Sequence, residues 1–199
     1  MPEAVVHIVD DDEAVRRSLA FLLSSAGHAV RLYDSATAFL GALSGVKAGC
    51  LITDIRMPEM SGIELLHALK TKACALPAIV ITGHGDVPLA VEAMKAGAVD
   101  FIEKPFDEEA ILRAVETALQ RSGEKGSGEV SSIAARLASL SERERQVLEG
   151  LIAGHSNKTI AHDLGISPRT VEVYRANLMA KMEAKSLSEL IRMAIVAKL

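Results

Sequence analysis

The feature that most constrains the fold is a regular alternation, over the first 121 residues, of short apolar runs with segments of helical spacing. The runs are about four to six residues long and rich in β-branched side chains, which favours strands over buried helices. Because each pair of parallel strands needs a crossover connection, this alternation predicts a parallel sheet with helices on both faces. The expected strands are residues 5–9, 29–33, 50–53, 78–82 and 99–102, and the expected helices are residues 13–26, 35–43, 61–72, 86–96 and 107–121.

The remainder of the chain has a different character. Residues 122–129 are small, polar and rich in glycine, which is typical of a flexible linker. Strand-like runs then disappear, and helices are expected at residues 131–138, 141–154, 157–164, 168–183 and 187–198. Their start signals are Ser141 with Glu144, Ser156, Ser167 with Pro168, and Ser186 with Glu189. We therefore expect an α/β domain at residues 1–121, a linker at 122–139 and an all-helical domain of four helices at 140–199.

Charge changes along the chain in the same way. Residues 1–121 carry 11 basic and 17 acidic side chains, whereas residues 122–199 carry 11 basic and 9 acidic ones. An acidic first part and a mildly basic second part fit a metal or phosphate site joined to a domain that binds a polyanion.

Other patterns exclude several classes of protein. No run of about 18 apolar residues exists, so no membrane span is expected, and the N-terminus lacks the basic and apolar regions of a signal peptide. Cys50 and Cys74 lack the spacing of a zinc site or a redox pair, which favours two reduced thiols. These patterns together predict a cytoplasmic protein.

Polar side chains follow four of the expected strands, at the edge of a parallel sheet where functional groups gather. They are Asp10–Asp11–Asp12 after the first strand, Asp54 after the third, Thr82 at the end of the fourth and Glu103–Lys104–Pro105 after the fifth. With the strand order 2-1-3-4-5, the first and third strands are neighbours and their carboxylates converge. Crowded carboxylates repel one another, and Mg²⁺ suits such a site because it accepts a few protein oxygens and keeps waters that a phosphoryl group can replace.

Such a pocket is equipped to transfer a phosphoryl group to a carboxylate. Asp54 is the candidate nucleophile, Lys104 and the metal neutralise the charge of the transferring oxygens, and Thr82 donates a hydroxyl hydrogen bond. Asp12 fits a helix cap as well as a metal ligand. A phosphatase of the haloacid-dehalogenase type also forms an aspartyl phosphate, but it needs the pattern D-x-D-x-T, and residues 10–14 lack the threonine.

These residues resemble the receiver domain of two-component response regulators, over about residues 4–121. The matching elements are Asp10–Asp11, residues 54–58 (Asp-Ile-Arg-Met-Pro), residues 81–83 and residues 104–106. The resemblance implies that Asp54 accepts the phosphoryl group and that Asp10, Asp11 and the main-chain carbonyl of Arg56 hold Mg²⁺. It also implies that Thr82 and Lys104 contact the phosphoryl group and that the Lys104–Pro105 peptide bond is cis.

The same resemblance implies a conformational switch. Phosphorylation adds charge at Asp54 and draws in Thr82, beside a loop with two glycines at residues 83–85. The aromatic side chain of Phe101 then turns inward, although many members of the family have tyrosine there. Helix 86–96 and strand 99–103 would form a dimer surface that depends on phosphorylation. No catalysis is expected beyond the transfer and loss of the protein's own phosphoryl group.

In the second part of the chain, Gly165 separates two expected helices in the manner of a helix-turn-helix, whose second helix can enter the major groove of DNA. Val171, Leu178 and Met182 have the spacing of a buried face. The outward or flanking positions of the second helix are Arg169, Thr170, Glu172, Val173, Arg175 and Ala176.

Residues 140–199 resemble the LuxR-type helix-turn-helix domain, on residues 140–144, 154–161 and 164–175. The resemblance implies base contacts by Glu172, Val173 and Ala176, and phosphate contacts by Lys158, Thr170, Tyr174, Asn177 and Lys181. Glu172 and Ala176 stand where relatives often have basic residues. With a small positive charge, one module is expected to bind DNA weakly, so that dimerisation matters; part of helix 187–198 would contribute to a dimer on DNA.

A receiver joined to a LuxR-type module is the combination of the NarL/FixJ family. That resemblance implies phosphorylation by a sensor histidine kinase, formation of a homodimer, binding to double-stranded DNA and an action on RNA polymerase, and activation of nitrogen-fixation or microaerobic genes. Two alternatives stay open at this stage. The helical domain could bind a protein, which would make the chain a phosphate sink or adaptor, or DNA binding could be constitutive beside an inactive receiver.

Overall fold

The computed structural model describes residues 4–46, 48–83, 87–121 and 129–197. The chain divides into two compact units, one of residues 1–85 and 96–124 and the other of residues 86–95 and 125–199. The glycine-rich residues 122–128 and the loop residues 84–86, about which the sequence made predictions, lie outside the described residues. No helix within the described ranges is long and apolar enough to cross a membrane.

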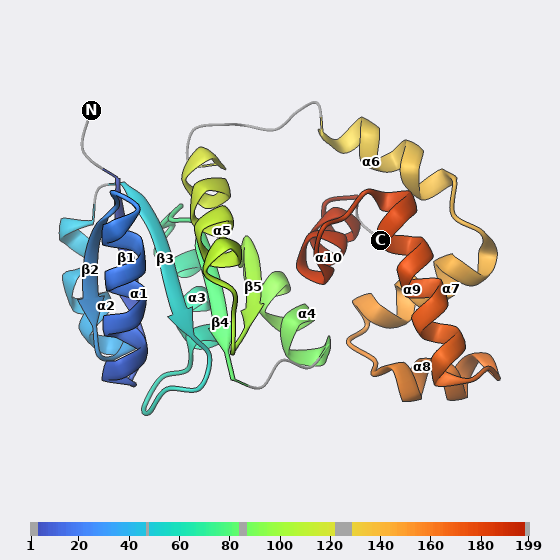
Figure 1. Cartoon of the computed structure of the whole chain (residues 1–199), viewed down its shortest axis with the longest axis horizontal. Helices are drawn as coiled ribbons and strands as arrows, with labels where there is room; N and C mark the ends of the chain where they lie inside the picture. The colour runs from blue at the N-terminus through green and yellow to red at the C-terminus, as the bar shows by residue number, and fades with distance from the viewer. Residues whose placement is uncertain (1–3, 47, 84–86, 122–128, 198–199) are drawn as a thin grey trace. The chain divides into compact units, whose positions relative to one another are not determined.

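The first unit is built on a sheet of five parallel strands (Figure 1). The strands lie in the order β2-β1-β3-β4-β5, which confirms the predicted order. Their carboxyl ends meet at the lower edge of the sheet as it is drawn in Figure 1. The strands are β1 (Val5–Val9), β2 (Ala29–Tyr33), β3 (Gly49–Asp54), β4 (Ala78–Thr82) and β5 (Asp100–Glu103).

Helices cover both faces of this sheet. Helices α1 (Glu13–Ser25) and α5 (Glu108–Arg121) pack on one face, where Leu19, Leu23 and Ile111 meet the buried side chains of β1, β3 and β4. On the other face Phe39 of helix α2 (Ala36–Ala42) packs edge-on against Tyr33. The remaining elements of this unit are a 3₁₀ turn (Leu43–Gly45) and helix α3 (Gly62–Thr71). Helix α4 (Val87–Ala96) lies between β4 and β5 in the sequence, and all but its last residue is assigned to the second unit. All predicted bounds lie within about two residues of the observed ones.

The second unit contains five helices after the linker residues, and they share one apolar core. They are α6 (Glu129–Ala138), α7 (Glu142–Ile152), α8 (Asn157–Leu164), α9 (Pro168–Met182) and α10 (Leu187–Val196). Helix α6, in the stretch predicted as linker, buries Ile133 and Leu137 among the side chains of α7, α9 and α10. The helical unit therefore includes α6, which precedes the predicted domain start at residue 140.

The helix starts follow the predicted signals with one exception. Ser141 and Glu144 form a reciprocal capping box, and Pro168 follows the capping Ser167. Ser186 accepts from the Glu189 N–H, but the Glu189 carboxylate accepts from the Lys185 N–H, so the capping box predicted there is only half correct.

Both cysteines are free thiols, as the spacing predicted. Cys50 is fully buried in β3, and burial raises the pKa of its thiol to about 12. Since the thiolate is the reactive form, Cys50 acts as a small apolar core residue.

Candidate functional site

The carboxylates of Asp10 and Asp54 lie side by side beyond two adjacent strands. The register pairs Val9 with Thr53, so the residues that follow them reach the sheet edge together. Asp10 is 1% exposed and Asp54 is 6% exposed. The Lys104 ammonium bridges them, 2.8 Å from Asp10 Oδ2 and 2.7 Å from Asp54 Oδ1. The structure thus brings together three residues that the sequence assigned to one pocket.

The electrostatics of this cluster follow from burial and from the shared ammonium. Burial raises the pKa of Asp10 above its ordinary value, against the lowering effect of hydrogen bonds from Lys104 and the Asp12 N–H. Burial alone would lower the pKa of Lys104, but hydrogen bonds and charge attraction from Asp10 and Asp54 raise it. Lys104 therefore stays protonated and supplies a fixed positive charge beside Asp54.

Main-chain groups hold Asp54 in place. Its Oδ2 accepts from the Arg56 N–H at 2.6 Å, and its main-chain oxygen accepts from the Thr53 hydroxyl at 3.0 Å. Helix α3 begins against this segment, where the Gly62 N–H donates to the Ile55 carbonyl at 2.9 Å. A Cβ atom at Gly62 would overlap the main-chain oxygen of Asp54, so only glycine permits this approach. Sequence reasoning did not identify Gly62, although it follows the strand-end motif by only a few residues.

Asp10 is held by a side chain of helix α1, and Lys104 is held by the main chain of β4. The Arg16 side chain donates to the main-chain oxygen of Asp10 at 2.6 Å, a contact that the sequence did not reveal. The Lys104 N–H donates to the Thr82 carbonyl at 2.7 Å, and the Lys104–Pro105 peptide bond is cis, as the resemblance implied. Asp12 caps α1, accepting from the N–H groups of Ala14 and Val15, which is one of its two predicted roles.

The donor set fits a hard cation such as Mg²⁺ in chemistry. Asp10 and Asp54 are buried carboxylates that both contact the Lys104 ammonium, and the next residue after Asp10, Asp11, is exposed. Among the described residues, no three acidic, histidine or cysteine side chains are arranged as a ready metal site. The sequence also assigned the main-chain carbonyl of Arg56 to the metal. Arg56 lies two residues after Asp54, and its N–H donates to the Asp54 carboxylate.

The two predicted switch residues lie on neighbouring strands. Thr82 is 1% exposed at the end of β4 and pairs in register with Glu103. Phe101 is half-buried in β5, opposite Val80, and its N–H donates to the Asp100 carboxylate at 2.8 Å. Thr82 therefore lies at the same strand edge as Lys104, whereas Phe101 lies further back along the sheet.

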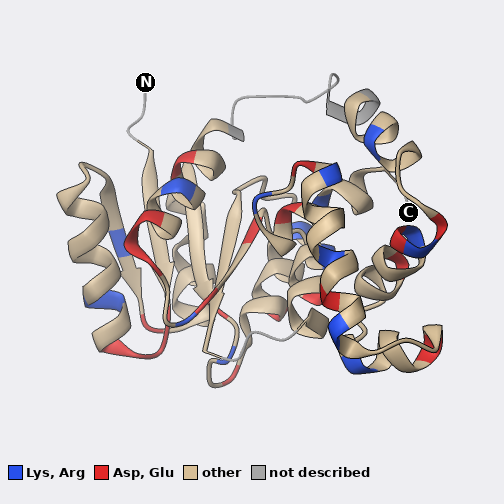
Figure 2. Ribbon diagram, turned by 45° about the vertical axis from the view of Figure 1, so that its right-hand side comes forward, with Lys and Arg blue, Asp and Glu red and all other residues tan. Residues whose placement is uncertain are grey.

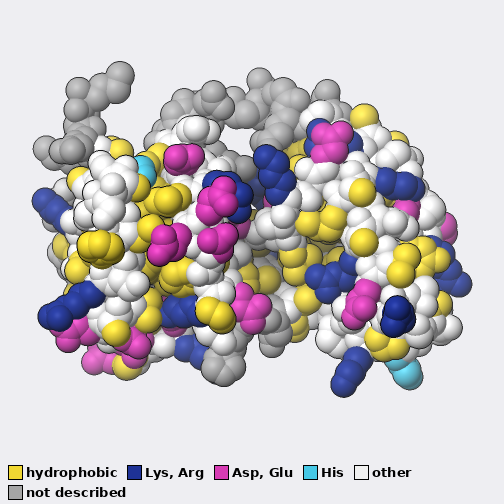
Figure 3. Space-filling view, viewed as in Figure 1, with side chains coloured by type: hydrophobic (Ala, Val, Ile, Leu, Met, Phe, Trp, Pro, Cys, Tyr) yellow, Lys and Arg dark blue, Asp and Glu magenta, His cyan; other side chains and the backbone are white. Residues whose placement is uncertain are grey.

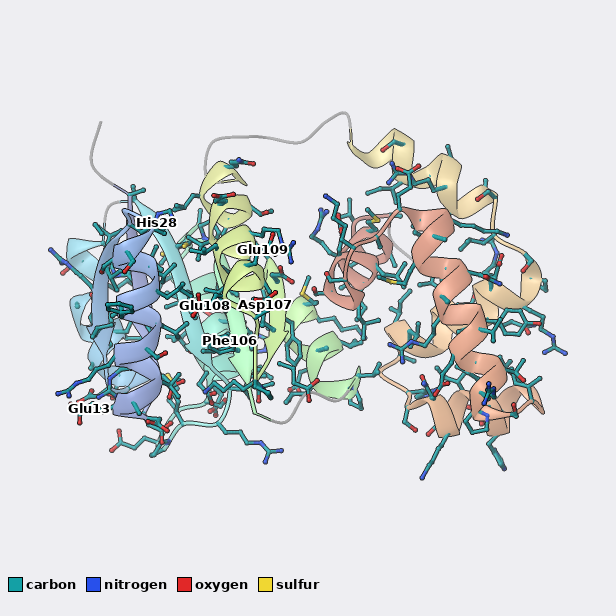
Figure 4. The ribbon with its side chains drawn as sticks, viewed as in Figure 1. Glu13, His28, Phe106, Asp107, Glu108 and Glu109 are labelled. Carbon is teal, nitrogen blue, oxygen red and sulfur yellow. The ribbon has the colours of Figure 1, made fainter. Side chains whose placement is uncertain are left out.

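The surroundings of the pocket are acidic. Glu13 begins α1, while Asp107, Glu108 and Glu109 follow Phe106 at the start of α5 (Figure 4). Figure 2 shows the Asp and Glu positions in the loops at this edge, and Figure 3 shows acidic side chains over α5. Acidic residues in a first helical turn are stabilised by the helix dipole, so most of this charge has a structural reason.

In the second unit, α8 and α9 form a helix-turn-helix. Gly165 ends α8 with φ of 64°, in the left-handed region that favours glycine, and Ser167 then caps α9. Val171, Leu178 and Met182 are fully buried, which confirms the predicted inner face. Of the residues that the sequence assigned to DNA, seven are exposed and Thr170, Tyr174 and Arg175 are half-buried. The exposed ones are Lys158, Arg169, Glu172, Val173, Ala176, Asn177 and Lys181.

Two residues predicted to contact DNA are engaged within the protein. The Arg175 guanidinium donates to Asn157 Oδ1 at 2.9 Å and ties α9 to the start of α8. The Lys181 ammonium lies 2.7 Å from the buried Glu144 carboxylate of α7. Both side chains therefore position α9, a role that the sequence did not suggest because each partner lies far away in the chain.

Two family models match the chain one after the other. The model of the response regulator receiver domain matches residues 6–116, and that of bacterial regulatory proteins of the luxR family matches residues 138–194. The transcriptional regulatory protein FixJ of Azorhizobium caulinodans is 60% identical, over 99% of this chain and 95% of that protein. FixJ of Rhizobium meliloti is 58% identical, over 98% and 97%.

Solved structures give the same relationship. Full-length FixJ from B. japonicum is 55% identical, with a TM-score of 0.60 over 100% of this chain and 98% of that one. The structure of FixJ-N is 58% identical, with a TM-score of 0.58 over 60% of this chain and 96% of that one. The chain therefore belongs to the FixJ-like response regulators, transcription regulators that combine a receiver domain with a LuxR-type DNA-binding domain.

Proposed function

We propose that a sensor histidine kinase phosphorylates Asp54 and that the phosphorylated protein forms a homodimer, binds double-stranded DNA and activates transcription. The observation that carries this proposal is the Lys104 ammonium, which lies 2.7 Å from Asp54 Oδ1 and 2.8 Å from Asp10 Oδ2. A buried acid beside a fixed cation, at the edge of a parallel sheet, is suited to accept a phosphoryl group.

The reaction forms one bond and breaks one. A carboxylate oxygen of Asp54 attacks the phosphorus of a phosphohistidine, the P–N bond breaks, and the imidazole leaves with the electron pair. Lys104 balances the negative charge of the phosphoryl oxygens, and the Arg56 N–H keeps the other carboxylate oxygen oriented. Mg²⁺ bound by Asp10, Asp11, Asp54 and the Arg56 carbonyl would supply further charge neutralisation. The domain turns over no other substrate in this proposal.

The residues around Asp54 then respond to the charge of the phosphoryl group. Thr82 ends β4 at the same edge and donates its hydroxyl to the phosphoryl group, while Lys104 transfers part of its hydrogen bonding from Asp10 to that group. Phe101 lacks a hydroxyl, so any coupling through its side chain acts by packing.

The output is DNA binding by the helix-turn-helix, in the cytoplasm, followed by recruitment of RNA polymerase. We extend the proposal to nitrogen-fixation and microaerobic genes because of the close similarity to proteins named FixJ. Since the helical unit has little net charge, the contribution of phosphorylation is to assemble two modules on one site.

A DNA-binding titration of the full chain and of Asp54→Asn tests this function, each with and without acetyl phosphate and Mg²⁺. We expect the phosphodonor to tighten binding by wild type at least tenfold and to leave Asp54→Asn unchanged. Equal responses would contradict the switch. Phosphorylation without any DNA binding would favour the phosphate sink or adaptor instead.

A further inference from the structure

Asp10 and Asp11 lie between two regular elements, after β1 ends at Val9 and before α1 begins at Glu13. The internal hydrogen bonds of the strand and of the helix therefore do not include the peptide group that joins the two residues. The carboxylates of these neighbours are nevertheless the proposed ligands of Mg²⁺. They can hold one ion tightly only if the main chain between them keeps a single conformation.

The Arg16 side chain of α1 holds this peptide group. Its Nη1 atom donates to the main-chain oxygen of Asp10 at 2.6 Å. That oxygen belongs to the planar peptide between Asp10 and Asp11, so the contact restricts ψ of Asp10 and φ of Asp11 together. The orientation of the two carboxylates relative to each other depends on these two angles.

Three further hydrogen bonds complete the arrangement around Asp10. Its N–H donates to the Tyr33 carbonyl at 3.3 Å, and its Oδ1 accepts from the Asp12 N–H at 2.9 Å. Asp12 also caps α1, and its main-chain oxygen accepts from the Arg16 N–H at 3.0 Å. Arg16 therefore begins the hydrogen bonding of α1 with its main chain and closes a ring back to Asp10 with its side chain.

The surroundings of Arg16 differ from those of its neighbour Arg17. Arg17 is exposed and pairs with Glu13, which is labelled at the start of α1 in Figure 4. Arg16 is half-buried and, within the part of the chain that the structure describes, has no carboxylate partner. A cation beside a carboxylate pocket repels Mg²⁺ by its charge. The charge of Arg16 therefore opposes metal binding, whereas its hydrogen bond to the Asp10 carbonyl favours it.

We propose that Arg16 is a positioning residue for the Mg²⁺ site of the receiver. It holds the peptide group between Asp10 and Asp11 and so keeps their carboxylates in the arrangement that the ion requires, while it contacts neither the ion nor the phosphoryl group. The proposal rests on the proposed function, since it takes the pocket around Asp54 to be one that binds Mg²⁺ and accepts a phosphoryl group.

Calorimetric titration of the full chain with Mg²⁺ measures the affinity before any phosphodonor is present. We expect Arg16→Met to raise the dissociation constant of Mg²⁺ about tenfold, as is typical when a residue that orients a metal ligand is removed. Arg17→Met is the matched control, because it removes the same charge one residue away and leaves the contact with the Asp10 carbonyl in place. Its dissociation constant is expected to stay within about twofold of the wild-type value.

Arg16→Lys keeps the charge and a flexible donor, and it is expected to recover part of the lost affinity. Labelling of Asp54 by acetyl phosphate then separates affinity from chemistry. For Arg16→Met we expect the Mg²⁺ concentration at half-maximal rate to rise by the same factor, while the rate at saturating Mg²⁺ stays within about twofold of wild type. A lower saturating rate with an unchanged Mg²⁺ dependence would contradict the proposal. If Arg16→Met does not fold, Arg16→Gln, which also has high helix propensity, is judged by the same criteria.

The direction of the change in Mg²⁺ affinity decides between the two effects of Arg16. Binding of Mg²⁺ by Arg16→Met as tight as by wild type, or tighter, would overturn the positioning role, since only the repelling charge would then matter. If wild type itself neither binds Mg²⁺ nor is labelled at Asp54, the proposed function fails as well. Labelling of wild type together with an unchanged affinity of Arg16→Met leaves that function in place and overturns the role of Arg16 alone.

Discussion

Lys104 donates a hydrogen bond of 2.7 Å to Asp54 across fifty residues of sequence. The same ammonium contacts Asp10, so two buried carboxylates depend on one cation. Removing it leaves both acids close together and uncompensated in a site of low exposure. The stability of the receiver and its chemistry therefore depend on the same residue.

Replacing Lys104 by methionine is expected to lower the free energy of unfolding of the sheet unit by about 2–4 kcal/mol at neutral pH without divalent cations. Urea titration measures this loss. We expect that Mg²⁺ restores part of the lost stability of the variant. We expect that it does not restore phosphorylation of Asp54 by acetyl phosphate. The double variant Lys104→Met/Asp54→Asn serves as control and should be more stable than Lys104→Met, since one of the repelling charges is gone. The reverse order would contradict the charge argument.

Gly62→Ala is expected to destabilise the protein by about 1–3 kcal/mol and to slow phosphorylation of Asp54, because the added methyl group overlaps the Asp54 main-chain oxygen. The matched control is Gly41→Ala in α2, where a Cβ atom meets nothing within 4 Å. There we expect a gain of about 0.5–1 kcal/mol from the improved helix propensity. Thermal unfolding and the rate of acetyl phosphate labelling measure both effects; normal labelling of Gly62→Ala would contradict a positioning role.

The Glu144–Lys181 pair is expected to stabilise the helical unit by about 1–2 kcal/mol, discounted because Lys181 is 41% exposed. A double-mutant cycle with Glu144→Gln and Lys181→Met measures this coupling energy. The hydrogen bonds from Lys181 and from the Ser141 N–H lower the pKa of Glu144. Because the pKa of Glu144 is lower in the folded chain than its ordinary value of 4.5, the pair stabilises the fold fully above about pH 4.5. This stabilisation is lost as the pH falls below that value. A cycle with no coupling at pH 7 would disprove the pair's contribution.

Salt dependence separates the two lysines that the sequence assigned to phosphates. Lys158 is exposed and has no ion pair among the described residues, so Lys158→Met should reduce the slope of log binding constant against log salt by about 1. Lys181→Met should weaken binding through stability and leave the slope unchanged. Binding titrations at several salt concentrations measure both slopes. An equal decrease for Lys181→Met would show that Lys181 contacts phosphate after all.

His7 makes the sheet unit sensitive to acid. Burial and the nearby charge of Arg31 lower the pKa of this imidazole, whose Nδ1 lies 3.3 Å from the Tyr33 hydroxyl. Because the unfolded chain binds the proton more readily, stability is complete above about pH 6.5 and falls by up to about 1.4 kcal/mol per pH unit below it. Urea titrations followed by Tyr33 fluorescence, in a Tyr174→Phe background, measure the slope. His7→Phe should flatten it, and His67→Gln, at an exposed position of α3, should not.

The fold was predictable because each of its signals is local. Strand-length apolar runs, capping serines such as Ser141 and the glycine at residue 165 act within a few residues, and the structure confirms their placement. The expected strand order is also the observed one, and it pairs β1 with β3, which brings Asp10 and Asp54 to adjacent strand ends. The half of the Ser186 capping box that was predicted wrongly also depends on neighbouring residues. The N–H groups of Lys185 and Ser186 compete for the Glu189 carboxylate, and the Lys185 N–H donates to it.

The site was predictable only where a motif marks it. Asp10, Asp54 and Lys104 stand at strand ends, and parallel strands bring such residues together. The contacts of Glu144 with Lys181 and of Asn157 with Arg175 join residues 37 and 18 positions apart, and no periodicity predicts which charged side chains meet. The need for glycine at residue 62 depends on how closely α3 approaches β3, which is a property of packing.

Helix α6 has a practical consequence for exchanging effector modules between regulators. Arg136 donates to the Met182 carbonyl at 3.1 Å and pairs with Glu183, so α6 is attached to the end of α9 as well as packed on it. The luxR-family match begins at residue 138, at the last residue of α6. A chimera joined at that position would discard Ile133, Leu137 and Arg136 and expose the apolar surface that they cover. A junction placed before Glu129 would transfer helices α6–α10 with the apolar core that they share.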